Sequence, residues 1–177
     1  PSLPPVPPNV PILRDYAAIS LSLAAGLRYL GVEATLASSA YRVNPRDRSG
    51  SCFSSTSAFE VMTKGRKIVG SAQRRGAGGI LQHGSILLDL DVDKLASLFW
   101  LSNEGARAKL ANNLRKKTIS VREALGGRLV SHDEARAALE KGFCDLAGEL
   151  VVGSLTPEEL KEVFPLAKEK KEEFRVK

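Results

Sequence analysis

Three strand-like segments joined by two short turns constrain this chain more than any other part of it. The first covers residues 58–62, where Phe59 and Val61 alternate with Ala58, Glu60 and Met62, and Lys64-Gly65 supplies the turn that follows. The second and third cover residues 66–74 and 80–90. Strands joined by turns this short pair antiparallel. The sequence therefore predicts a small antiparallel sheet in the middle of the chain.

Helical patterns lie on both sides of these strands. Apolar residues recur with a helical period over residues 12–30, Gly31 ends that segment, and a short strand is expected at 32–36. The C-terminal part is expected to be helical, with segments at 92–101, at 103–116, from Ser131 to about Leu146, and from Pro157 onward with a break or kink at Pro165. This order of elements predicts an α+β fold.

Two segments carry no periodic apolar pattern. Residues 1–11 are rich in proline, which excludes a helix or a central strand and predicts an extended linker. Residues 38–56 are rich in Ser, Arg, Pro and Gly, and we interpret them as a long loop. Loops of this length in compact domains are usually functional or disordered.

Composition limits the classes of protein to which the chain can belong. Its 177 residues are 43% hydrophobic and 26% charged, which fits one globular domain. Two distant cysteines exclude a disulfide scaffold, and no apolar run is long enough to cross a bilayer. Free thiols without a signal-peptide pattern favour the cytoplasm.

The positive charge is concentrated in one segment. The chain carries 26 Lys and Arg against 20 Asp and Glu, and residues 42–75 hold the whole excess. Such a field attracts phosphates or an acidic partner protein, although a solvated basic loop has the same composition. Nucleic acid is not expected as a partner, because the segment contains no stacking pattern of aromatic residues and no nucleic-acid-binding motif.

Cys52 is the first residue that could carry chemistry. It lies among small residues beside the basic segment, where nearby Arg46, Arg48 and Lys67 could stabilise a thiolate. The alternative is an ordinary loop cysteine. Cys144 follows Phe143 in a predicted helix, and a buried, inert thiol is expected there.

Lys67 is the second candidate, because it lies within a predicted strand. Side chains alternate along a strand, so Lys67, Val69, Ser71 and Gln73 should share one face, with Gly70 and Ala72 on the other. The polar face either lines a pocket or contacts solvent. The small residues leave room for a linear acyl chain or a nucleotide to approach the backbone.

His83 is the third candidate. With two histidines and no other ligands at suitable spacing, a metal site is not expected. A histidine that lines a pocket or lies satisfied in the core is the simplest interpretation. A Cys52–His83 pair of nucleophile and base is conceivable, but the sequence does not show that the two residues meet.

Several short motifs in residues 52–85 resemble the lipoate and octanoate protein transferase and ligase family, which is related to biotin protein ligases. The motifs are the Cys52-Phe53 pair, Glu60, the Gly-Arg-Lys block from Gly65 to Gln73, and the Gln-His-Gly-Ser block from Gln82 to Ser85. The resemblance is greatest to the octanoyltransferase branch that uses a loop cysteine, and it extends more weakly over residues 12–174.

The resemblance implies a mixed, mostly antiparallel sheet with flanking helices, and it implies acyl transfer. Cys52 would attack octanoyl thioester on an acyl carrier protein, and a lysine of a lipoyl domain, such as the glycine-cleavage H protein, would accept the acyl group. Lys67 would bind the acyl carbonyl and lower the thiol pKa. The substrate-binding residues would be Gly70, Ser71, Ala72, Gln73, Gln82, His83 and Gly84. The reaction would need no cofactor, and the protein would not bind a membrane.

The chain departs from the family pattern upstream of residue 12. The family carries paired arginines and a Gly-Gly pair there, whereas this sequence has the proline-rich stretch. We therefore expect residues 12–177 to be the C-terminal portion of the catalytic domain. The alternatives are a fragment, a second polypeptide that supplies the N-terminal half, or a protein that has lost the activity.

Two other functions remain open. An ATP-dependent lipoate–protein ligase would use Lys67 but would need no cysteine at position 52. A non-catalytic module would dock a carrier protein or lipoyl domain through the basic segment, and its binding would be sensitive to salt.

Overall fold

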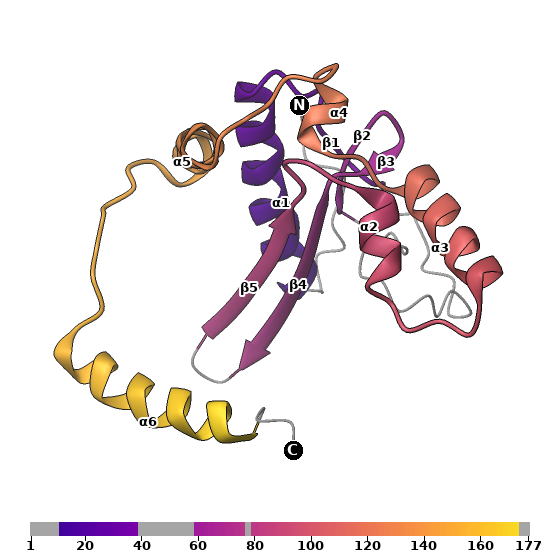
Figure 1. The fold of residues 1–177 in the computed structure, drawn as a ribbon. Helices are drawn as coiled ribbons and strands as arrows, with labels where there is room; N and C mark the ends of the chain where they lie inside the picture. Colours follow the sequence, from indigo (N-terminus) through magenta and orange to yellow (C-terminus); the bar gives the residue numbers. More distant parts are fainter. Residues whose placement is uncertain (1–10, 39–58, 77–78, 174–177) are drawn as a thin grey trace.

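The computed structural model describes residues 11–38, 59–76 and 79–173. Helices and two small sheets build an α+β fold, as the sequence predicts (Figure 1). Helix α1 (Pro11–Tyr29) leads into a three-stranded sheet of β1 (Thr35–Leu36), β2 (Val61–Thr63) and β3 (Arg66–Lys67). Both strand pairs in this sheet are antiparallel.

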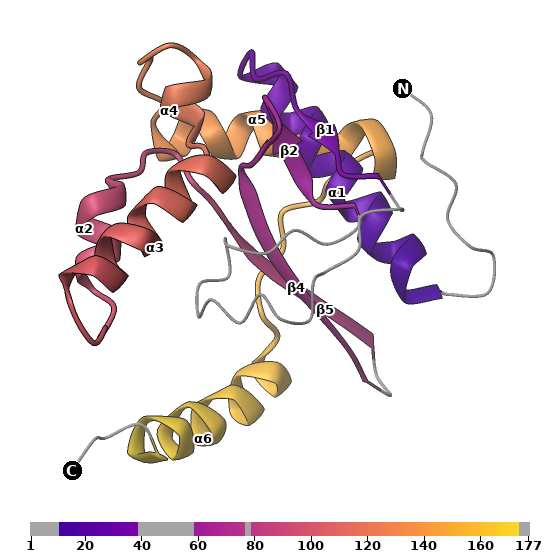
Figure 2. The ribbon, with the colours of Figure 1, turned by 90° about the vertical axis from the view of Figure 1, so that its right-hand side faces the viewer.

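A second, two-stranded sheet follows at once. Strand β4 (Val69–Gly76) pairs antiparallel with β5 (Gly79–Ile86), and the hairpin extends away from the helices (Figure 2). The predicted single strand over 66–74 is therefore interrupted at Ile68, which lies between the two sheets. The predicted strand over 80–90 also ends early, at Ile86.

Four helices follow the hairpin before the C-terminal one. The short α2 (Val92–Ser97) and the longer α3 (Glu104–Lys117) pack together, and a further turn, α4 (Val121–Ala124), precedes α5 (His132–Ala147). The predicted segment at 92–101 ends sooner, at Ser97. Helix α5 begins where the capping box predicts, because the Ser131 hydroxyl accepts a hydrogen bond from the Glu134 backbone N–H at 3.1 Å.

Helix α6 (Pro157–Glu173) stands apart at the end of an extended segment, residues 148–156 (Figure 1). Thr156 and Glu159 cap its N-terminus reciprocally. Pro165 lies inside the helix and does not end it, so the break that the sequence allowed at this position does not occur. Its side chain is exposed, so water can hydrate the carbonyl that the proline leaves without an intrahelical donor.

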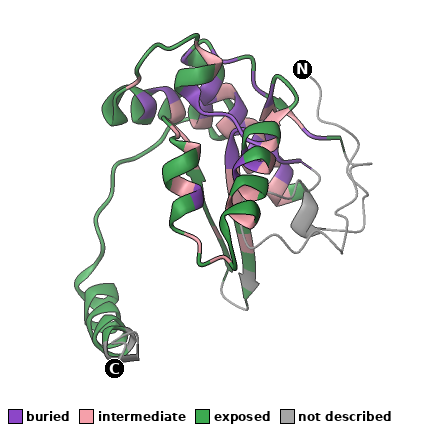
Figure 3. Cartoon of the chain, turned by 45° about the vertical axis from the view of Figure 1, so that its right-hand side comes forward, coloured by how far each residue is buried: buried purple, intermediate pink, exposed green. Residues whose placement is uncertain are grey.

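The core lies where α1, the small sheet and the chain on either side of α4 meet, and Figure 3 shows the buried residues gathered there. Backbone hydrogen bonds join these parts: Leu87 donates to Ile68, Ile119 to Lys67, and Val121 to Leu87. Fully buried side chains fill the space between them, including those of Leu27, Phe59, Ile68, Leu114, Ile119 and Val121. This arrangement fixes the strand that carries Lys67.

Helices α1 and α5 cross at very close range. A Cβ atom on Gly142 would lie 2.3 Å from the backbone nitrogen of Gly26 and 2.4 Å from the carbonyl oxygen of Ser22. A Cβ on Gly26 would lie 2.8 Å from the Leu139 Cα. Only glycine allows this separation of the two backbones, which positions α1 against the hairpin.

Candidate acyl-transfer site

Lys67 is buried and ion-paired. Its Nζ lies 2.7 Å from the Oε1 of Glu60, and the two side chains are 3% and 5% exposed. The β2–β3 hairpin produces this contact. Met62 pairs directly with Lys67, so Glu60, two residues earlier, lies diagonally across from Lys67. The Lys64-Gly65 turn, with φ of 49° and 71°, is the two-residue loop that sets this register.

Phe59 orients Glu60 from the other side. Phe59 has a φ of 63° and is fully buried, and a bulky residue seldom adopts that conformation. Its backbone N–H donates to Ala37, and the Ala37 N–H donates to the Glu60 carbonyl. Strained backbone of this kind persists where the surrounding structure requires it, often at functional sites.

Tyr16 is a further member of this cluster, although the sequence pattern suggested only a core residue of the first helix. Burial raises the pKa of its phenol, the negative charge of Glu60 raises it further, and a hydrogen bond with Ser71 acts in the opposite direction. Tyr16 therefore remains protonated at neutral pH and connects α1 to β4. No signal in the sequence distinguishes Tyr16 from the apolar residues that recur with a helical period over residues 12–30.

The polar residues of β4 and β5 separate onto two faces. Directly paired residues share a face, so Ser71 lies with Gly84, and Gln73 with Gln82, whose side-chain amides are joined at 2.9 Å. This face borders a cavity of about 170 Å³ against α1 and α5, with walls from Ile19, Leu23, Val69, Ser71, Gln82, His83, Gly84, Ile86 and Phe143.

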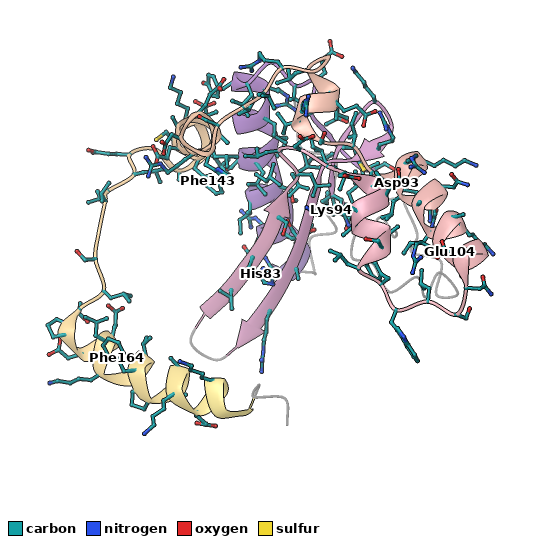
Figure 4. The ribbon with its side chains drawn as sticks, in the orientation of Figure 1. His83, Asp93, Lys94, Glu104, Phe143 and Phe164 are labelled. Atoms are coloured by element: carbon teal, nitrogen blue, oxygen red, sulfur yellow. The ribbon has the colours of Figure 1, made fainter. Side chains whose placement is uncertain are left out.

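The opposite face of the hairpin is open. Ala72 pairs with His83, and Gly70 pairs with Ser85 on the same face. Ala72, His83 and Ser85 are exposed, and Figure 4 shows where His83 lies along the hairpin. Small side chains thus leave the backbone of β4 accessible beside an imidazole. A Cβ on Gly84 would lie 2.4 Å from the Gly70 carbonyl oxygen, so the two strands also approach closely here.

The prediction that Lys67, Val69, Ser71 and Gln73 share one face of a strand is only partly correct. Lys67, Ile68 and Val69 are buried in succession, because the chain leaves one sheet and enters the other at Ile68. Alternation therefore does not carry from Lys67 to Ser71. Glu60, the buried partner of Lys67, belonged to the motif but was not predicted as a site residue.

The predictions for the two cysteines have different outcomes. Cys52 lies outside the described residues, so its predicted role and a Cys52–His83 pair remain predictions. Cys144 is exposed, which contradicts the expected buried thiol. Helix α5 buries Ala135, Ala138 and Gly142, and Cys144, two residues after Gly142, points away from that face.

The described residues contain no candidate metal site and no candidate membrane-spanning helix. No group of His, Cys, Asp and Glu in residues 11–38, 59–76 and 79–173 could hold a metal ion. No helix in the same part of the chain is long and apolar enough to cross a membrane.

Several curated proteins are similar in sequence to this chain over most of its length. Octanoyltransferase LipM of Bacillus cereus is 42% identical over 172 residues, and LipM of Bacillus subtilis is 40% identical over 172 residues. These alignments cover 93% and 92% of this chain but 62% and 61% of the relatives. The chain thus spans somewhat less than two thirds of the relatives' length.

Solved structures share the fold. A bi-partite lipoate protein ligase of Thermoplasma acidophilum aligns with a TM-score of 0.67 at 22% identity, over 90% of this chain and 55% of that one. Lipoate-protein ligase A bound with ATP aligns with a TM-score of 0.60 at 22% identity, over 89% of this chain and 55% of that one. The family described as the lipoyl protein ligase A/B catalytic domain matches residues 5–144. The chain belongs to this family.

Proposed function

We propose that this protein transfers an octanoyl group from an acyl carrier protein to a lysine of a lipoyl domain, through a thioester on Cys52. The buried ammonium of Lys67 carries the proposal, because a positive charge held at a fixed point can stabilise a developing oxyanion. The identity to octanoyltransferases supports it.

The proposed reaction has two balanced steps. In the first, the Cys52 thiolate attacks the carbonyl of the carrier thioester, the carrier sulfur leaves with the electron pair, and it takes up a proton. In the second, the neutral amine of the acceptor lysine attacks the Cys52 thioester. An amide forms, the amine loses a proton, and the Cys52 thiol is restored.

Each site residue has a proposed part in these steps. Lys67 binds the acyl carbonyl and lowers the Cys52 thiol pKa, and Glu60 holds the Lys67 ammonium in place. The acyl chain lies against the hairpin, whose proposed binding residues are Gly70, Ser71, Ala72, Gln73, Gln82, His83 and Gly84. Ser71, Gln82, His83 and Gly84 border the cavity against α1 and α5, and the remaining walls of that cavity are apolar, which suits an acyl chain.

The donor requirement tests the proposal. We expect octanoyl transfer to the glycine-cleavage H protein from octanoyl-loaded acyl carrier protein without ATP, and none from free octanoate with ATP. Mass spectrometry of the acceptor measures the product, and an acceptor whose target lysine is replaced by arginine is the control. Transfer that requires ATP and the free acid would instead indicate a ligase, and no transfer from either donor would contradict both enzymes.

A further inference from the structure

The basic residues described within 59–75 are largely engaged in the fold. Lys64 Nζ donates to the Ala124 carbonyl at 3.0 Å, Arg66 pairs with Glu123 at 2.5 Å, and Lys67 pairs with Glu60. Lys64 and Arg66 therefore make contacts within the protein, and Lys67 belongs to the proposed acyl-transfer site. Arg42, Arg46 and Arg48 of the basic segment lie outside the described residues, but another group of basic side chains lies among the described ones.

The pair of helices α2 and α3 provides an exposed excess of positive charge. Residues 91–117 contain six basic residues and three acidic ones. Two of the acidic residues are used in ion pairs, Glu104 with Arg107 and Asp93 with Arg115. Lys94, Lys109 and Lys116 are exposed and form no ion pair with any residue in the described part of the chain.

Two large apolar side chains are exposed between the helices that carry these lysines. Leu98 and Trp100 lie in the connection between α2 and α3, and their exposed fractions are 75% and 101%. Figure 4 locates the connection between the labelled Lys94 and Glu104. Aromatic residues dominate the energetics of protein interfaces, and surrounding charges steer the encounter. A fully exposed tryptophan between two helices that carry exposed lysines therefore indicates a binding surface.

The far end of α3 connects this surface to the site. Thr118 follows α3, bridges to Lys67, and is followed by Ile119, whose N–H donates to the Lys67 carbonyl at 3.0 Å. Helix α3 has 14 residues and is therefore about 21 Å long. A carrier docked along the helix could deliver its acyl group to Lys67 on an extended arm.

We propose that Leu98, Trp100, Lys94, Lys109 and Lys116, here called the α2–α3 surface, dock the acidic carrier protein that donates the acyl group. This inference rests on the proposed function and adds the place where the donor binds. Asp91, Asp93 and Glu104 are interspersed with the lysines. Asp93 and Glu104 are held in ion pairs, so the exposed lysines dominate the charge of this surface, and a folded protein can match such a mixed pattern.

Trp100 is the only tryptophan of the chain, so its fluorescence reports on this surface directly and without catalysis. We expect a titration with a tryptophan-free acyl carrier protein to shift the Trp100 emission to shorter wavelength as the indole becomes buried. Raising the salt concentration from about 0.05 M to about 0.5 M should weaken binding about tenfold or more, because screening shortens the reach of the charges.

Charge reversal locates the binding surface. In the combined variant Lys94→Glu, Lys109→Glu and Lys116→Glu, the affinity for the carrier should fall by about tenfold or more. The matched control reverses three exposed lysines of α6, Lys161, Lys168 and Lys171, and should bind as the unmodified protein does. Thermal unfolding and far-ultraviolet circular dichroism of both variants verify that they are folded.

The readouts separate this inference from the proposed function. A Trp100 shift with carrier protein that is lost only in the α2–α3 variant supports the docking surface even if no acyl transfer is detected. Acyl transfer from the carrier without any Trp100 response, or equal loss of affinity in the two variants, overturns it. A response to anionic lipid vesicles but not to the carrier also overturns it and assigns the surface to a membrane.

Discussion

The variant Gly142→Ala should be destabilised by about 2 kcal/mol or more, because overpacking where two backbones touch forces them apart. The added Cβ would lie 2.3 Å from the Gly26 nitrogen and 2.4 Å from the Ser22 carbonyl oxygen. Alanine gains about 1 kcal/mol in helix propensity over glycine, so the measured loss is what remains after that gain. Urea unfolding followed by circular dichroism measures it.

Gly153→Ala is the matched control for that experiment. Gly153 lies in the extended segment before α6, and a Cβ there would meet nothing within 4 Å. Its free energy of unfolding should stay within about 0.5 kcal/mol of the unmodified protein. Equal stability of Gly142→Ala and Gly153→Ala would mean that α1 and α5 can separate freely, and the close crossing would then not hold α1 in position.

Removing Lys67 alone should be more damaging than removing it together with its partner. Lys67→Met leaves the Glu60 carboxylate buried without its cation, and breaking a buried pair in this way costs about 3–5 kcal/mol. The double variant Glu60→Leu, Lys67→Met places apolar groups in the same space and should recover most of that loss. Both variants should lose acyl transfer, since each lacks the ammonium.

The neighbouring pair Arg66–Glu123 supplies the control. Its side chains are 24% and 55% exposed, so Glu123→Gln, which removes only the carboxylate charge, should cost about 1 kcal/mol or less. Chemical unfolding and octanoyl transfer are measured on all the variants. A double variant as unstable as Lys67→Met would contradict the stabilising role of the pair. A fully active Lys67→Met would contradict the proposed role of the ammonium.

Local signals predicted local structure well in this chain. Lys64-Gly65 forms the two-residue turn, with positive φ at both positions, and Ser131 caps α5 as the capping box predicts. Thr156 and Pro157 begin α6 where expected. Each of these features depends on residues within four positions of one another, so the sequence carries the information directly.

Features that depend on distant residues could not be predicted in this way. The break at Ile68 arises because the chain passes between two sheets, and periodicity within one strand does not report it. Tyr16 and Ser71 form a hydrogen bond between α1 and β4, two elements that are far apart in the sequence. The exposure of Cys144 depends on which face of α5 meets α1, and the apolar neighbours Phe143 and Leu146 suggested the wrong face.

The site itself was predicted as a set of residues and not as an arrangement. The motif residues predicted Lys67 and the two blocks of the hairpin, and the structure separates Ser71, Gln73, Gln82 and Gly84 from Gly70, Ala72 and His83. Pairing register, which depends on how β4 and β5 align, determines that separation. Placing the two groups on opposite faces of the hairpin therefore required the pairing of the strands.

The acyl adduct on Cys52 tests the central claim most directly. After incubation with octanoyl-loaded acyl carrier protein, intact-protein and peptide mass spectrometry should show one octanoyl group on the peptide that contains Cys52. Hydroxylamine should release it, Cys52→Ser should abolish it, and Cys144→Ser should leave it unchanged. An undiminished adduct in the Cys52→Ser variant would contradict the proposed mechanism.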